Sequence, residues 1–326
     1  MEKKTGLSIA NMLSVIGLIG LGLGTAMGIV LEGKEVAIAI GCGAGVFILG
    51  ILGLFLAVKA KKAESEFGKW RKYEYLGLAL CIGVIAFSAQ PCMYSANFII
   101  SNRSLREAGD SDIATVRGMI TRFKAQEADR LNLTREGLDN YLSFNPSVVS
   151  SSLQSFIIYE VMHGSPGIFN RHVLNEYVAE KSYLIEHGNF NEDLFGKYNH
   201  ELDMISSRLT NFDFADFPSM ATALTALSDS VGANLTALSY NFNFGNIGLN
   251  DRGIYDYEPT AGYEYTERAT TFGAKYAAMF TPGLGAIGLF AAFALLYILD
   301  YFLEFRSLRV PVKQGPKISD NDGLPL

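Results

Sequence analysis

The four histidines are the residues best suited to catalysis or metal binding, and all of them fall between positions 101 and 271. His172 and Glu176 are four residues apart, so on a helix they would share one face and could hold a divalent metal ion together. The chain has no His-Glu-x-x-His motif and no closely spaced cysteine pair, which are the stronger metal signals. We therefore expect no metal and no cofactor, with His172 and Glu176 as the candidate ligands if a metal were bound.

Motifs of nucleophilic and nucleotide chemistry are also missing from the sequence. There is no Gly-x-Ser-x-Gly elbow, no P-loop and no dinucleotide fingerprint. No run of basic residues carries the interleaved aromatic residues that a nucleic-acid surface needs. The three cysteines, Cys42, Cys81 and Cys92, fall inside apolar runs and are interpreted as small apolar side chains. These observations argue against an enzyme and against a nucleic-acid partner.

Long apolar runs make up much of the rest of the chain, which is 49% hydrophobic. They cover about 13–31, 36–58 and 75–100, with a fourth at about 276–299 inside the segment 272–303. None of the four contains Asp, Glu, Lys, Arg or His, and each could cross a hydrocarbon core of roughly 30 Å as a helix. The sequence predicts an all-α polytopic membrane protein with four transmembrane helices and a large, mainly helical extracytoplasmic domain between helices 3 and 4.

The orientation follows from the basic residues that flank the apolar runs. The connector 59–74 carries Lys59, Lys61, Lys62, Lys69, Arg71 and Lys72, whereas the connector between the first two runs carries only Lys34. Because basic loops stay in the cytoplasm, both termini and the tail 304–326 are expected there. The segment 101–271, with about 13 basic and about 23 acidic side chains, is then extracytoplasmic. A bacterial cytoplasmic membrane is the expected location.

Most of 101–271 has helical periodicity. Apolar residues recur every three or four positions over 112–128, and further helices are expected to begin near 145, 166, 191 and 218, giving a bundle of five or six. The helix that begins near 166 is predicted to stop at Gly188. Residues 240–265 alternate aromatic and polar types with Gly and Asn between them, which favours short strands or an irregular loop. Two interpretations of its aromatic residues stay open, a cover at the membrane interface and a surface for partner docking. The docking candidates are Tyr240, Phe242, Phe244, Tyr255, Tyr257, Tyr263 and Tyr265.

Small residues and prolines are expected to shape the packing of the spans. Rows of small residues four apart allow close helix approach, either within the chain or between copies of it. The candidates are Gly20, Gly24 and Gly28 in the first span, Ala37, Gly41 and Gly45 in the second, and Gly288 and Ala292 in the last. Pro91 and Pro282 are predicted to bend their helices.

Four functions remain open on the sequence alone, and the weakest of them is an enzyme that acts on a membrane or envelope substrate through His172 and Glu176. The leading one is a non-enzymatic membrane scaffold or accessory subunit of an envelope assembly. Such a subunit would use the lipid bilayer, other membrane or envelope proteins and copies of itself as partners. The second is a sensor or receptor that binds a ligand in the outer domain and signals through a partner. The third is an oligomeric channel component, with a path lined by Gln90, Asn97 and the two prolines.

Overall fold

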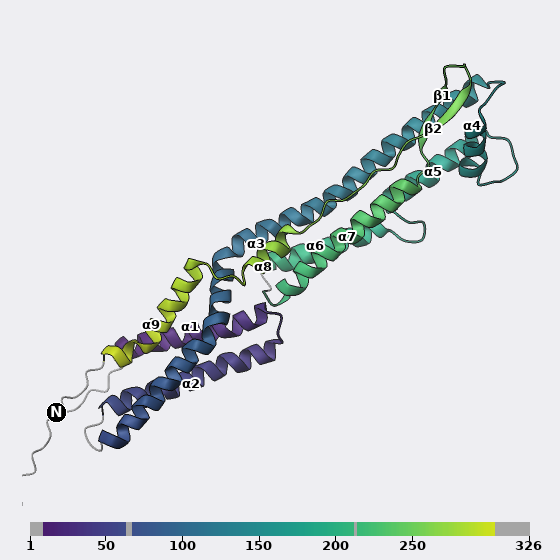
Figure 1. Ribbon diagram of the computed structural model, residues 1–326. Helices are drawn as coiled ribbons and strands as arrows, with labels where there is room; N and C mark the ends of the chain where they lie inside the picture. Colours follow the sequence, from purple (N-terminus) through teal and green to yellow (C-terminus); the bar gives the residue numbers. More distant parts are fainter. Residues whose placement is uncertain (1–8, 63–66, 212–213, 304–326) are drawn as a thin grey trace, which may run out of the picture. The chain divides into compact units, whose positions relative to one another are not determined.

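The chain folds into two compact units. A computed structural model describes residues 9–62, 67–211 and 214–303 (Figure 1). The span unit comprises the chain up to Ile99 together with the part that begins at Pro282, and the bundle unit comprises Ile100–Thr281. One long helix, α3 (Phe67–Phe144), contributes its first part to the span unit and the remainder to the bundle unit.

The span unit contains four helices that are long and apolar enough to cross a membrane. They are α1 (Ile9–Leu31), α2 (Val36–Lys62), the first part of α3, and α9 (Leu284–Leu303). Helix α1 packs against both α2 and α9. The predicted all-α class with four candidate spans is therefore confirmed at the level of length and composition.

The last candidate span begins later than the apolar run predicts. Helix α8 (Thr271–Ala278) ends before Pro282, and α9 begins only at Leu284, so Pro282 lies between two helices and not within one. A proline has no N–H to donate to a helix, and the residue before it is biased away from helical geometry. Helix α9 also continues past position 299 and includes Asp300, which is 7% exposed.

The small residues that α2 buries differ from the predicted row. Its buried residues are Ala39, Gly43, Val46, Gly50, Gly53, Ala57 and Ala60, alternately four and three apart. A spacing of four turns the row by about 40° per step around a helix, whereas alternating four and three keeps it on one face. Ala37 and Gly41 are accordingly exposed, and a Cβ added to Gly41 or Gly45 would meet nothing within 4 Å.

The predicted row of α1 does face its neighbours. A Cβ on Gly20 would meet the ring of Phe293 on α9, and a Cβ on Gly28 would collide with the backbone of Pro91 in α3. Gly24 faces Cys92, with 2.8 Å between its added Cβ and the sulfur. On α9, by contrast, the predicted small residues Gly288 and Ala292 are exposed in the span unit.

We expect Gly43→Leu to destabilise the span unit and Gly41→Leu to leave it nearly unchanged. A Cβ on Gly43 would stand 2.7 Å from the carbonyl oxygen of Gly22, so a larger side chain must push α1 and α2 apart. Overpacking of this kind costs about 1–3 kcal/mol. Thermal unfolding of both variants in the same detergent would measure the difference. Equal melting temperatures would contradict the close approach of α1 and α2.

The bundle unit is built on the remainder of α3, along which the later helices lie (Figure 1). Its other elements are α4 (Ser151–Phe156), the π-helix η1 (Ile157–Val161), α5 (Arg171–His187), α6 (Leu194–Asn211), the 3-10 helix η2 (Phe214–Asp216), α7 (Phe217–Asn241), strands β1 (Gly245–Leu249) and β2 (Tyr255–Pro259), and α8. The strands pair antiparallel, with Gly245 opposite Pro259 and Leu249 opposite Tyr255. The hairpin confirms the strand signal in 240–265.

Local sequence signals explain several of these boundaries. Helix α5 begins where the Asn170 side chain accepts hydrogen bonds from two backbone N–H groups, and it ends at Gly188, whose φ of 77° suits glycine. The predicted stop at Gly188 is confirmed. No break separates the apolar part of α3 from its polar part, so the helix expected over 112–128 is a section of one 78-residue helix.

An extended segment, residues 260–270, returns along α3 and α7 from the hairpin to α8 (Figure 1). Side chains of α7 fasten it: Tyr265 N donates to Thr236 Oγ1 at 3.0 Å, and Ala269 N donates to Ser228 Oγ at 2.9 Å. We call residues 260–270 the return segment. Its hydrogen bonds with α7 side chains replace those of a sheet or helix.

Candidate partner-binding surface

The two candidate metal ligands, His172 and Glu176, form a pair on the surface. His172 Nε2 and Glu176 Oε1 are 3.3 Å apart on the first turns of α5, and their side chains are 81% and 67% exposed. His163 pairs with Glu180, and His187 pairs with Asp193. A zinc ion needs three or four protein ligands. Among the described residues, no group of three or more His, Cys, Asp or Glu side chains could hold a metal ion.

Most of the aromatic residues proposed for docking belong to the core of the bundle unit. Phe242, Phe244, Tyr255 and Tyr265 are buried, each at most 5% exposed. The rings of Phe242 and Phe244 stack on each other, and Tyr265 packs edge-on against Phe123 of α3. This burial corrects the expectation of a docking face along the whole of 240–265. An alternating aromatic pattern marks the inner face of a hairpin as readily as an outer one.

Three members of the aromatic set are less buried. Tyr240 and Tyr263 are 53% and 40% exposed, and Tyr257 is half-buried. The Tyr257 ring stacks on Phe156 with centroids 4.2 Å apart, and its hydroxyl donates to the carbonyl of Asn243 at 2.8 Å. Burial, with a smaller contribution from Glu160, raises the pKa of Tyr257 to about 12. Tyr257 therefore stays a neutral hydrogen-bond donor at physiological pH.

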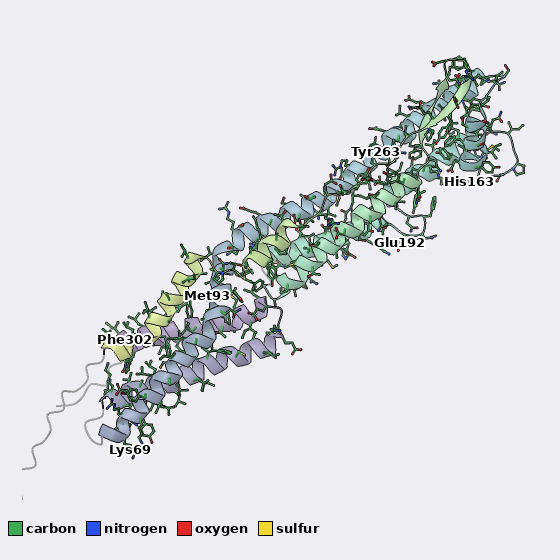
Figure 2. The ribbon with its side chains drawn as sticks, viewed as in Figure 1. Lys69, Met93, His163, Glu192, Tyr263 and Phe302 are labelled. Carbon is green, nitrogen blue, oxygen red and sulfur yellow. The ribbon has the colours of Figure 1, made fainter. Side chains whose placement is uncertain are left out.

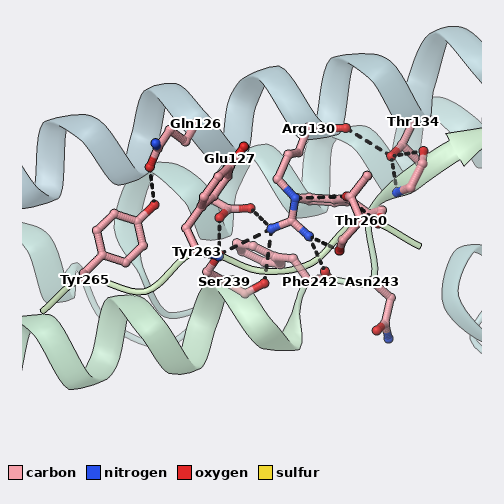
Figure 3. Close-up of polar contacts among 12 residues, drawn as sticks. Gln126, Glu127, Arg130, Thr134, Ser239, Phe242, Asn243, Thr260, Tyr263 and Tyr265 are labelled. Atoms are coloured by element: carbon pink, nitrogen blue, oxygen red, sulfur yellow. Dashed lines mark hydrogen bonds and ion pairs between the residues drawn. The ribbon is translucent and has the colours of Figure 1, made fainter. Parts of the chain in front are cut away.

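A buried ion pair on α3 holds residues 239–260 against that helix (Figure 3). Arg130 Nη1 and Glu127 Oε2 are 2.7 Å apart, and their side chains are 5% and 0% exposed. The second Glu127 oxygen accepts a hydrogen bond from the Ser239 hydroxyl at the end of α7. Arg130 Nη2 donates to the carbonyls of Phe242 at 3.2 Å and Thr260 at 2.9 Å. One guanidinium thus joins α3, α7 and the return segment.

Aromatic rings also contact this ion pair, in addition to its hydrogen-bond partners. The rings of Phe244 and Tyr263 lie 5.5 and 5.7 Å from the Arg130 guanidinium carbon. Burial raises the pKa of Glu127 above its ordinary value, against the Ser239 hydrogen bond and the Arg130 charge, which lower it. One turn further along α3, the Thr134 hydroxyl accepts from Gly245 N at 3.0 Å, which fixes the start of β1.

Sequence reasoning missed this network although a signal for it exists. Phe123, Glu127, Arg130 and Thr134 are spaced four, three and four apart and continue the apolar stripe of 112–128. Polar residues at core-facing positions of a helix need buried partners. The partners, Ser239, Phe242 and Thr260, are more than 100 residues away and could not be identified from spacing.

The end of the bundle unit that carries β1 and β2, which we call the hairpin end, has an irregular backbone. Helix α4 passes into the π-helix η1, and such helices often occur at functional sites. Asn145 and His163 have positive φ angles of 41° and 50°. Figure 2 shows His163 at this end. The two positive φ angles thus lie on either side of the segment that contains α4 and η1.

Hydrogen bonds nevertheless hold the hairpin end firmly. Ser150 N donates to the Tyr255 carbonyl at 2.9 Å, and Asp256 accepts from the Ser152 hydroxyl at 2.5 Å and from its neighbour Tyr257 N at 2.8 Å. Hydrogen bonds from the Ser152 hydroxyl first, then from the Ser150 hydroxyl and from Tyr257 N, lower the pKa of Asp256 to about 2. The carboxylate is thus ionised across the physiological pH range, and its hydrogen bond with Ser152 joins α4 to β2.

Large apolar side chains are exposed at this end. They are Phe144, Val148, Ile158, Tyr159, Ile168 and Leu249, and we refer to them as the hairpin-end set. Ile168 is 84% exposed, Phe144 72% and Tyr159 70%. The ring of Phe144 lies 6.3 Å from that of Tyr255, which ties the end of α3 to the hairpin. All six belong to the segments that make up the hairpin end, and exposed apolar side chains of this size are a feature of protein interaction sites.

Comparison with known proteins adds no relative. No family model matches the chain, and no curated protein or solved structure matches it either.

Proposed function

We propose that the protein is a non-enzymatic scaffold or accessory subunit of a membrane assembly. In this proposal, the span unit anchors it in the bilayer and the bundle unit presents the hairpin-end set to a partner protein. The exposure of the hairpin-end set carries the proposal. Contiguous exposed apolar patches mark protein interaction sites, and the hairpin-end set includes side chains as exposed as Ile168 and Phe144.

The polar groups inside the bundle unit support a structural role for that unit. Glu127 and Arg130 are engaged with each other and with backbone groups of α7 and the return segment. Asp112 accepts a hydrogen bond from Phe272 N at 2.8 Å and so fixes the start of α8. These buried charges have partners that stabilise the fold, as buried polar groups normally do.

The proposed orientation places the bundle unit outside the cytoplasm. It rests on the six basic residues of the connector 59–74, since basic residues near span ends are retained in the cytoplasm. The span unit offers further contact area for other membrane proteins, because Gly41, Gly288 and Ala292 lie on exposed helix faces. Small residues on such faces let a second helix approach closely.

Site-specific photo-cross-linking in native membranes tests the proposal. A photoreactive phenylalanine analogue at Tyr159 or Ile168 should give a discrete adduct with one partner protein. The same analogue at Met204, which is 44% exposed on α6, should not. The adduct formed from position 159 should disappear when Ile168→Asp is added and persist when Met204→Asp is added. Equal labelling at all three positions would refute a docking role for the hairpin end.

A further inference from the structure

The span unit contains a pocket of about 420 Å³ among α1, α2 and α9. Its wall is apolar and consists of Val15, Leu18, Ile51, Leu54, Phe55 and Val58. Its polar lining consists of Asn11, Ser14, Lys59, Lys62 and Asp300. These residues come from the first two turns of α1, the last turn of α2 and the last turn of α9. The pocket is therefore apolar along the helices and charged at their ends.

A buried carboxylate forms one part of the polar lining. Asp300 is 7% exposed, and its backbone N donates to Ser14 Oγ at 3.0 Å. With the Asn11 amide oriented to donate, its nitrogen lies 2.5 and 2.6 Å from the two Asp300 carboxylate oxygens. An acidic side chain in the last turn of a helix faces the negative end of the helix dipole. The fold therefore holds Asp300 in a position that its own helix disfavours.

Two lysines form the other part of the polar lining of the pocket. Lys59 and Lys62 are both exposed at the end of α2. The Lys59 ammonium lies 5.3 Å from the ring of Phe55, which itself lines the pocket, so the charge is held close to the apolar wall. The neighbouring Lys61 points to a different partner, since its ammonium donates to the Tyr301 carbonyl at 2.5 Å.

A ligand that fits this lining carries a negative and a positive group on one head and an apolar chain behind them. The lysines match a phosphate, and the Asp300 carboxylate matches a primary ammonium group. The apolar wall matches an acyl chain, and lysines at the end of a span stand at the depth of lipid headgroups. A basic pocket between spans that lacked Asp300 would suit any anionic lipid.

We propose that this pocket binds an aminophospholipid, a lipid whose headgroup has both a phosphodiester and a primary amine. The phosphate lies against Lys59 and Lys62, the amine donates to Asp300, and one acyl chain lies along Val15, Leu18 and Leu54. Asp300 is the specificity-determining residue, because its carboxylate accepts a hydrogen bond from the amine and repels lipids that carry only negative charge. The proposal does not depend on the function proposed for the bundle unit.

Native mass spectrometry of the full chain in a mild detergent tests this site. Phosphatidylethanolamine is expected to bind about tenfold more tightly than phosphatidylcholine, whose methylated amine cannot donate a hydrogen bond, and more tightly than phosphatidylglycerol, which lacks an amine. Asp300→Asn should remove this preference while binding persists. Lys59→Gln combined with Lys62→Gln should weaken binding of all three lipids. Lys34→Gln, in the connector at the opposite end of α2, should change nothing.

Two further measurements keep the test decisive. If Asp300→Asn fails to fold, Val58→Trp, which fills the apolar part of the pocket, should reduce occupancy by every lipid. Water-soluble phosphoethanolamine should not displace the bound lipid, because it lacks the acyl chain. Equal affinity of the wild-type chain for the three lipids would overturn the proposal. Displacement by phosphoethanolamine would overturn it as well, since the site would then belong to a soluble ligand.

Discussion

Replacing Arg130 with methionine is expected to lower the free energy of unfolding of the bundle unit by about 3–5 kcal/mol, the usual cost of breaking a buried ion pair from one side. Methionine would leave the Glu127 carboxylate buried without its counter-charge and would strip the Phe242 and Thr260 carbonyls of their donor. Hydrogen exchange measured by mass spectrometry on the full chain should show faster exchange in peptides from 239–265. The melting temperature of the Arg130→Met variant should also be lower than that of the wild type.

Two companion variants identify the cause of that loss. Glu127→Gln combined with Arg130→Met should be less destabilised than Arg130→Met alone, because no buried charge then remains unpaired. Arg122→Met breaks the pair with Glu267, whose side chains are 46% and 42% exposed, and should cost less than about 1 kcal/mol. If Arg122→Met were as costly as Arg130→Met, burial would not be the reason for the effect.

The defect of Arg130→Met should also depend on pH. Burial already raises the pKa of Glu127 above its ordinary 4.5, and removing Arg130 takes away a charge that lowers it. A raised pKa in the folded state means that folding favours the protonated acid, so the stability it contributes is present at low pH. That stability is lost as the pH rises through the folded pKa. The gap in melting temperature between variant and wild type should therefore widen from pH 5 to pH 8.

Replacing Tyr297 with alanine should lower the free energy of unfolding of the span unit by about 3–5 kcal/mol. Tyr297 of α9 is 0% exposed and belongs to a core cluster with Leu18, Leu21 and Val46. Its hydroxyl donates to the Gly50 carbonyl of α2 at 2.9 Å. Alanine would remove both the ring and this link. Unfolding of the purified chain in mixed micelles, titrated with denaturing detergent, would measure the loss.

Milder substitutions separate the two contributions of Tyr297. Phenylalanine keeps the ring and loses only the hydrogen bonds, so Tyr297→Phe should cost about 1 kcal/mol. Leu295 of the same helix is 63% exposed, and Leu295→Ala should be nearly silent. A large loss in Leu295→Ala would show that α9 depends on its outward face, contrary to the packing described above.

The four candidate spans were predictable because the hydrocarbon thickness sets a length that an apolar run must reach. Which face of each helix packs against its neighbours was not predictable. Gly41 and Gly43 are both small residues in α2, yet only Gly43 touches α1, and the choice depends on where the partner helix lies. The sequence predicts that Pro282 lies inside a helix, because the apolar run continues on both sides of this residue. Composition alone does not distinguish a bend from an interruption.

The bundle unit was less predictable because its stabilising contacts join distant positions. Helical periodicity and the Gly188 stop were visible in the sequence, as was the tendency of 240–265 to form strands. Whether Phe244 faces inward or Ile168 faces outward depends on neighbours that periodicity does not name. The hairpin-end set could therefore not be distinguished from core residues before the fold was known.

Arg130 also sets an order of events during synthesis of the chain. Its guanidinium depends on Ser239, Phe242 and Thr260, which are made 109, 112 and 130 residues later. At about 5–20 residues per second, the interval to Thr260 is on the order of ten seconds. During that time the middle of α3 has already been synthesised. The inner face of this helix then carries the Arg130 charge before the groups that accept its hydrogen bonds exist. The bundle unit is thus completed late, when the return segment emerges.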